Sequence, residues 1–367
     1  MDRTGPFHAC SFLRHENPLS TTSRYHRAPW GTAVRIDENL TRIRLKNSRG
    51  HLMVNTYAWR EDDIFMVIDP GWPWTLDALE QALKDLELGA LDEVTHWLYT
   101  HTHIDHMGLT AILGERTDAA HLIAESVEPH LLTWHAFQDR MNDWSDWAAE
   151  AFASPAREQI AAMMKKDRAS GNRRTMVEVW GPARARNTEF FSIGEVLSIG
   201  SLNLEVIDAS GHDPMHVAFF ERARGWLFVG DAVLAVPTPI SRAMDDDLAM
   251  YEATLDRLES LGATALFPGH GTQLEGNAEQ IKAAIQRSRQ YVLDHRAALR
   301  AALEALDAPS DLLSLAIALT PDGKPYEPLT RWYVHVSSTD AHLHWLVDRG
   351  EVERIVDDSG PRYRSIS

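Results

Sequence analysis

The ten residues 99–108 read YTHTHIDHMG, and they decide the interpretation of the whole chain. Three histidines and an aspartate fall within six consecutive positions: His101, His103, Asp105 and His106. Because side chains two residues apart on an extended backbone point the same way, His101 and His103 share one side. Imidazole nitrogens and carboxylate oxygens bind Zn²⁺ in sites that keep a position open for water. The segment also follows an apolar run typical of a strand, so it predicts a metal site at a strand end.

Three later segments repeat the arrangement of a ligand-forming side chain directly after a predicted strand. One histidine in a loop is more often a surface residue than a ligand, but these segments occur in order after the first motif. Each of them has a glycine beside the ligand-forming residue, which lets the backbone approach closely. They are the segments of His212 and His216, of Asp231, and of His270.

The order of these motifs resembles the metallo-β-lactamase fold superfamily over about residues 29–272. The resemblance implies an α/β protein with an αββα sandwich and a binuclear metal site. The expected ions are two Zn²⁺, and Fe or Mn at one position stays open because all the donors are nitrogen and oxygen. By this resemblance His101, His103 and His212 bind the first metal, Asp105, His106 and His270 bind the second, and Asp231 bridges both.

Two further residues are expected to support the site without binding metal. Asp69, in the segment IDPG at 68–71, resembles an aspartate that supports the site in family members. The alternative for Asp69 is an aspartate that only starts a turn. His216 is expected to support the ligands through hydrogen bonds.

The predicted enzyme is a metal-dependent hydrolase that acts through a metal-bridged hydroxide. Two zinc ions that share a water lower its pKa toward neutrality. Asp105 is the candidate catalytic residue, because it can bind metal and also orient the water or accept its proton. The expected substrate is a small, partly apolar ester, thioester or lactone. The alternatives are a metal-dependent ribonuclease or phosphodiesterase that uses the tail, and a β-lactam hydrolase.

The overall composition restricts the partners and the compartment. The chain has 367 residues with 36 Lys and Arg against 53 Asp and Glu, which gives a formal net charge of −17. So acidic a protein repels phosphate backbones, which argues against nucleic acid and for a small-molecule substrate. The single cysteine, and the lack of a signal-peptide run or an apolar stretch of membrane-spanning length, predict a cytoplasmic protein without a membrane partner.

The chain is expected to divide into three parts. They are an irregular N-terminal arm over 1–29, a catalytic domain over 30–275 with a helical lid insertion over 126–185, and a small C-terminal α+β domain over 276–367. The tail pattern of helices followed by a hairpin resembles the winged-helix domain attached to many superfamily members. Its candidate recognition helix, 338–349, is acidic, so packing or formation of a homodimer is favoured over nucleic-acid binding.

Aromatic side chains near the expected site are candidates for a substrate pocket. Some follow Asp69 in the sequence, and the others belong to the segment 126–164, which is rich in Trp, Phe and Met. An apolar lining would favour an acyl or aryl group. The alternative is that the helical segment packs as core or forms a dimer interface. The candidates are Trp72, Trp74, Trp134, Phe137, Trp144 and Trp147.

Overall fold

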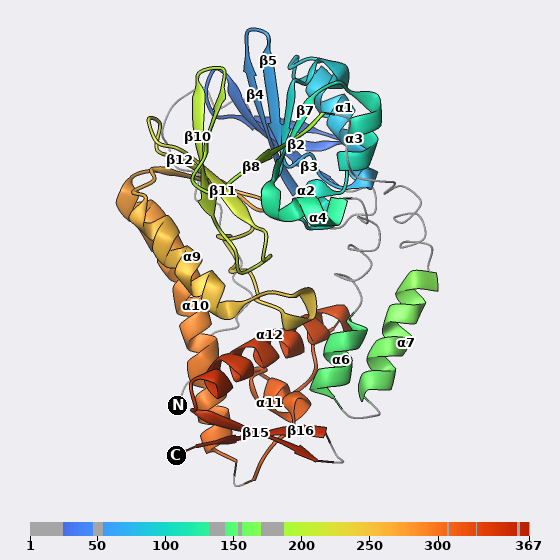
Figure 1. The fold of residues 1–367 in the computed structure, drawn as a ribbon, viewed down its shortest axis with the longest axis vertical. Coiled ribbons are helices and arrows are strands. Elements are labelled where there is room, and N and C mark those ends of the chain that lie inside the picture. Colours follow the sequence, from blue (N-terminus) through green and yellow to red (C-terminus); the bar gives the residue numbers. More distant parts are fainter. Residues whose placement is uncertain are drawn as a thin grey trace.

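Two β-sheets packed face to face form the upper half of the molecule in Figure 1, with helices on their outer sides. The computed structural model describes residues 25–46, 54–131, 144–152, 156–169, 187–306, 308–327, 329–357 and 360–366. The layers are helix, sheet, sheet, helix, so the predicted αββα sandwich is confirmed. No helix in these described ranges combines the length and the apolar character needed to cross a bilayer.

The first sheet has eight strands that follow one another in chain order. The first five pair as antiparallel neighbours, and from the fifth strand onward the pairing is parallel. Parallel neighbours need a crossover, which helices on the outer face supply. The strands are β1 (Tyr25–Ala28), β2 (Gly31–Arg35), β3 (Leu40–Leu45), β4 (Val54–Glu61), β5 (Ile64–Ile68), β6 (His96–Leu98), β7 (Ala120–Ala124) and β8 (Thr188–Phe191). The helices of this half are α1 (Leu76–Asp85), α2 (Ile104–Met107), α3 (Thr110–Arg116) and α4 (Glu128–Leu131).

The second sheet has six strands in the order β14-β13-β12-β11-β10-β9. Its outer face is covered by two helices, α9 (Leu248–Ser260) and α10 (Ala278–Glu304), which lie side by side in Figure 1. The strands are β9 (Val196–Ile199), β10 (Leu202–Asp208), β11 (Val217–Glu221), β12 (Trp226–Gly230), β13 (Ala265–Pro268) and β14 (Leu274–Glu275).

Both faces of the second sheet are buried, which explains its nearly continuous apolar strands. Phe228 and Phe267 point toward the first sheet, where their rings lie 5.3 Å and 5.5 Å from that of Tyr57. On the other face, Phe220 packs in a separate cluster with Tyr251 of α9. Because side chains alternate along each strand, this sheet contributes to a separate apolar core on each of its two faces.

The C-terminal part forms its own apolar cluster, in which helices and a hairpin enclose the central helix. Its elements are α10, α11 (Leu312–Ala318), α12 (Leu329–Asp348), β15 (Val352–Asp357) and β16 (Gly360–Ser365). The residues 336–343 in the middle of α12 are all buried. The helices and the hairpin follow one another in the predicted order, but the last helix begins at Leu329 and not at residue 338. The resemblance to a winged-helix domain stays a prediction.

Two sequence-based expectations need correction where the described residues bear on them. Residues 25–28 of the predicted irregular arm form β1, and 1–24 lie outside the described residues. In the predicted lid, α6 (Ser145–Ala151) and α7 (Ala156–Ala169) contribute to the C-terminal cluster (Figure 1). Burial against the C-terminal helices thus accounts for the apolar side chains of α6.

Candidate metal centre

The seven predicted ligands come from four loops at one edge of the sandwich. The loop after β6 carries His101 and His103, and α2, which begins directly after it, carries the next two. The other three follow the strands β10, β12 and β13, as the sequence predicted. The seven residues are His101, His103, Asp105, His106, His212, Asp231 and His270.

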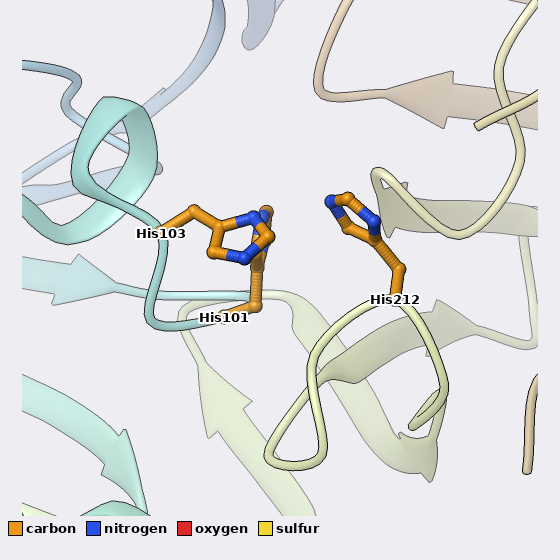
Figure 2. A group of neighbouring side chains, drawn as sticks. All are labelled: His101, His103 and His212. Atoms are coloured by element: carbon orange, nitrogen blue, oxygen red, sulfur yellow. The ribbon is translucent and has the colours of Figure 1, made fainter. Parts of the chain in front are cut away.

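The ligand atoms of these residues form three overlapping groups, within each of which all atoms lie within 4.8 Å of one another. Figure 2 shows the imidazole rings of the first group facing one another. A residue shared by two groups places the groups next to each other. The groups are His101, His103 and His212; His101, His106 and Asp231; and Asp105, His106 and His270.

The donor atoms of this cluster fit a metal ion. The Nε2 atoms of His101, His103 and His106 are buried and have no hydrogen-bond partner. The Oδ1 atom of Asp231 is also buried and has no hydrogen-bond partner. Buried polar atoms without partners cost free energy, and a bound cation would satisfy all four. Nitrogen and oxygen donors of this kind suit Zn²⁺, and they also suit iron or manganese.

The carboxylate of Asp231 lies between the two outer groups. Its Oδ1 is 3.6 Å from His106 Nε2, and its Oδ2 is 3.3 Å from His270 Nε2 and 3.8 Å from His212 Nε2. The Oδ2 of Asp105 is 3.0 Å from the same nitrogen of His270. Asp231 therefore reaches residues of both groups, as a bridging ligand requires.

The charges of the cluster divide the histidines into two classes. Burial lowers the pKa of His101 and of His212 well below the ordinary value, so both are neutral, the form that binds metal. Burial also lowers the pKa of His106, but the nearby carboxylates outweigh it and raise the pKa to about 10. In the same way, Asp231 and Asp105 raise the pKa of His270 to about 12 against its burial. Without metal, the carboxylates thus favour the protonated, positively charged forms of His106 and His270. Metal ions would supply this positive charge instead.

Asp69 fixes the tautomers of two ligands from behind. It is buried, and its Oδ2 accepts hydrogen bonds from His106 Nδ1 at 3.0 Å and from Thr100 Oγ1 at 2.7 Å. Because that hydroxyl donates to Asp69, it accepts from His101 Nδ1 at 2.9 Å. When a metal ion replaces the proton on Nε2, each ring keeps its other proton on Nδ1, where these hydrogen bonds hold it. Asp69 thus lies behind two candidate ligands, and its supporting role stays a prediction.

His216 lies behind the site as well. The backbone N–H of Asp231 donates to His216 Nε2 at 3.2 Å, and the ring stacks on His101 at 4.5 Å. Its Nε2 is thus already used, which fits a residue that positions Asp231. Two glycines allow this close packing: a Cβ on Gly230 would lie 2.7 Å from His216 Nε2, and one on Gly269 would lie 2.4 Å from Asp231 Oδ1.

Two buried carboxylates that the sequence interpretation missed also touch this region. Asp213 accepts from the backbone N–H of Thr102 at 2.7 Å and from its hydroxyl, and so holds the loop between His101 and His103. Asp246 has an Oδ2 3.8 Å from His212 Nδ1. Asp213 could have been noticed because it directly follows His212 in the sequence, whereas nothing in the sequence marks Asp246.

A pocket of about 510 Å³ opens beside the candidate metal centre. Its polar side is formed by ligands, including Asp105 and His270, and by Arg44. Its apolar side is formed by Met244 and by the residues 234–239, which read LAVPTP. This segment, between β12 and α9, was not among the predicted pocket residues.

The predicted aromatic pocket residues lie elsewhere. Trp147 is buried in the C-terminal cluster, and its Nε1 donates to Asp340 Oδ2 at 2.9 Å. Trp144 packs against the same cluster, whereas Trp72 and Trp74 pack against the main core with ring centroids 5.4 Å apart. None of these four lines the pocket of about 510 Å³. The other two candidates, Trp134 and Phe137, lie outside the described residues.

Comparison with known families agrees with this geometry. The sequence model of the Metallo-beta-lactamase superfamily matches residues 49–270, which include all seven candidate ligands. The chain belongs to the metallo-beta-lactamase superfamily. It is a hydrolase of that superfamily, and the predicted resemblance is confirmed.

Curated relatives of this superfamily member match at low identity. The probable metallo-hydrolase YqjP of Bacillus subtilis is 25% identical over 247 residues, which cover 64% of this chain and 72% of the relative. The atrochrysone carboxyl ACP thioesterase of Aspergillus fumigatus is 28% identical over 96 residues. That match covers 26% of this chain and 29% of the fungal protein, so the chain spans less than a third of its length.

Solved structures show the same metallo-beta-lactamase fold. A metallo-beta-lactamase family protein from Thermus thermophilus has a TM-score of 0.64 at 24% identity and covers 90% of this chain and 100% of its own. A beta-lactamase domain protein from Burkholderia ambifaria has a TM-score of 0.68 at 20% identity, with 92% and 94% covered. At these identities the likeness concerns the fold alone.

Proposed function

We propose that the chain is a binuclear metal-dependent hydrolase of a small, partly apolar ester, thioester or lactone. The observation that carries the proposal is the cluster of seven ligands beside a pocket with one apolar wall. His101, His103 and His212 would hold one ion, Asp105, His106 and His270 would hold the other, and Asp231 would join them. The donor set suits two Zn²⁺.

Two bound divalent ions supply Lewis acidity and lower the pKa of a water that they share. We assign Asp105, which lies in the pocket wall, to orient the attacking water and to receive its proton. Asp69 and His216 keep the ligands in place: the first fixes imidazole tautomers, and the second accepts the N–H of Asp231. These hydrogen bonds reduce the reorganisation that metal binding and the reaction need.

The substrate assignment rests on the shape and chemistry of the pocket. Leu234, Val236 and Met244 offer apolar contacts next to Asp105, where the reacting carbonyl would lie. Burial of an acyl or aryl group there contributes about 25 cal/mol per Å² of apolar area. The thioesterase named among the relatives supports a thioester as one member of the proposed class.

The described C-terminal part supports a packing role over nucleic-acid binding. The predicted recognition helix, 338–349, overlaps the end of α12, and its residues 338–343 are buried, so this half of it offers no surface to a nucleic-acid groove. The net charge of −17 adds repulsion of phosphates.

The test is a metal-analysed preparation that is assayed against acyl thioesters, lactones, aryl esters, β-lactams and a labelled RNA. The proposal predicts hydrolysis of at least one ester, thioester or lactone, lost on chelation and restored by Zn²⁺. Activity confined to RNA or to β-lactams would contradict the substrate class. Activity that survives complete metal removal would contradict the mechanism.

A further inference from the structure

Arg44 brings a guanidinium group into the wall of the pocket. The register of β3 and β4 pairs its neighbour Leu45 with Val54, and Val54 forms an isolated bridge with His270. Arg44 on β3 is therefore next to β4, the strand whose Val54 pairs with the candidate ligand His270. It lines the same pocket as His270 and Gly271.

A second arginine on the same face of β3 has a different environment. Side chains alternate along a strand, so Arg42 and Arg44 point the same way. Arg42 is 4% exposed, and its Nη1 donates to the carbonyl of Gly271 at 3.4 Å, which ties it to the loop after His270. The Nε atoms of both arginines are buried without a hydrogen-bond partner, but Arg44 is half-buried and lines the pocket, whereas Arg42 does not.

The guanidinium of Arg44 forms no ion pair with any residue that the structure describes, although Asp105 and Asp231 line the same pocket. Within the described ranges no carboxylate lies within ion-pair distance of it, although the chain carries a net charge of −17. A partly desolvated cation without a partner costs free energy, which an anionic ligand would offset. The planar guanidinium binds carboxylate and phosphate groups through paired hydrogen bonds.

We propose that the substrate carries a carboxylate or phosphate that binds Arg44, in addition to an apolar portion that contacts residues 234–239. This inference rests on the proposed function, because the scissile carbonyl must lie at the candidate metal centre. The anion belongs either to the far end of the acyl group or to the leaving group. Arg44 is then a specificity-determining residue, which distinguishes anionic from neutral substrates of equal length.

Three matched thioesters test the proposal with the metal-loaded enzyme: hexanoyl-pantetheine, adipoyl-pantetheine and hexanoyl-4′-phosphopantetheine. The second adds a carboxylate to the acyl end, and the third adds a phosphate to the leaving group. We expect kcat/KM at least tenfold above the neutral thioester for one of the two anionic substrates. Arg44→Gln should remove this excess mainly through KM, with a much smaller effect on the neutral thioester, and Arg44→Lys should keep part of the excess.

The control is Arg35→Gln, which changes an exposed arginine on the neighbouring strand β2 and should leave all three rates unchanged. Equal rates for the three substrates in the wild type, or an equal loss on all three in Arg44→Gln, would overturn the proposal. A wild type that hydrolyses none of the three thioesters removes the thioester from the proposed substrate class and leaves the ester and the lactone. Arg44 is then still tested by calorimetric binding of adipate and of 4′-phosphopantetheine to the metal-free protein. Weaker binding of either by Arg44→Gln supports the proposal, and equal binding of both overturns it.

Discussion

Arg242 donates a hydrogen bond from Nη1 to Oδ2 of Asp340 at 2.9 Å, across 98 positions of sequence. Asp340 is fully buried in α12, whereas Arg242 begins the short 3-10 helix η4 (Arg242–Met244). Ser337, nearly one turn before Asp340, accepts from the backbone N–H of Ala243 at 2.7 Å. The same 3-10 helix ends at Met244, which lines the pocket. The C-terminal part therefore holds one wall of the pocket.

This ion pair predicts a coupling between folding and substrate binding. Arg242→Met leaves the Asp340 carboxylate buried without its cation, so the free energy of unfolding should fall by about 3 kcal/mol. KM for apolar substrates should rise as the wall loosens. Urea denaturation and steady-state kinetics measure both effects. Arg364→Met removes an exposed pair with Glu353 and should cost less than about 1 kcal/mol, so equal losses would argue against the account.

Asp213 should prove as important as Asp69 for metal affinity. Its carboxylate holds the Thr102 backbone between two histidine ligands. Asp213→Ala should therefore weaken metal binding by about 10–100-fold, the usual cost of losing a hydrogen-bonded support behind the ligands. Competition with a chelator gives the affinity. The exposed Asp118→Ala is the matched control, and a similar affinity for both variants would remove Asp213 from the site.

An exposed apolar residue at the pocket should affect catalysis without affecting stability. Val236 lines the pocket and is 70% exposed, so Val236→Asp should leave the melting temperature nearly unchanged. It should lower kcat/KM for a hexanoyl substrate about tenfold, with a smaller effect on acetyl, because the longer chain loses more apolar contact. Val356→Asp, 63% exposed on the C-terminal hairpin, should change neither. An equal effect on both chain lengths would show that the wall does not contact the acyl group.

A buried histidine pair predicts how stability depends on pH. His295 and His342 stack at 4.2 Å between α10 and α12, where they face Arg296, His335 and Thr339. Burial lowers the pKa of His295 to about 3 and that of His342 well below its ordinary value.

Below about pH 6.5 the unfolded chain therefore binds protons that the folded chain excludes, so stability falls as the pH falls toward 4. The slope is at most about 1.4 kcal/mol per pH unit for each histidine. The double variant His295→Gln/His342→Gln should show a smaller loss than the wild type over this interval, in denaturation curves at pH 7, 6, 5 and 4. His26→Gln, on an exposed residue, should match the wild type; an unchanged slope in the double variant would refute the assignment.

The sandwich and the ligand cluster could be predicted because their signals are local. The spacing of His101 and His103, and the glycine beside Asp231, are fixed by the backbone geometry that the site requires. Trp144, which directly precedes α6, and Trp147 within α6 could not be assigned from their local sequence in this way. A run of large apolar residues has the same sequence pattern whether it covers a substrate or packs against another helix, and Trp147 does the latter.

The residues that surround the candidate ligands were harder to predict than the ligands themselves. Asp246 lies beside His212, and Arg44 lines the pocket, because the fold brings distant parts of the chain together, and no motif marks either residue. The wall at 234–239 reads as an ordinary loop, and its function depends on the sheet edge beside which it lies. Such residues become visible only when the fold places them together.

The most direct test of the account is the metal content per chain of the wild type and of Asp231→Ala, measured by mass spectrometry after equilibration with Zn²⁺. Asp231 lies within 4 Å of nitrogens from both outer ligand groups, so its loss should weaken both ions at once. The account predicts about two ions in the wild type, and fewer than one, without hydrolysis, in the variant. Full occupancy in Asp231→Ala, or a wild type that is active with a single ion, would contradict the binuclear centre.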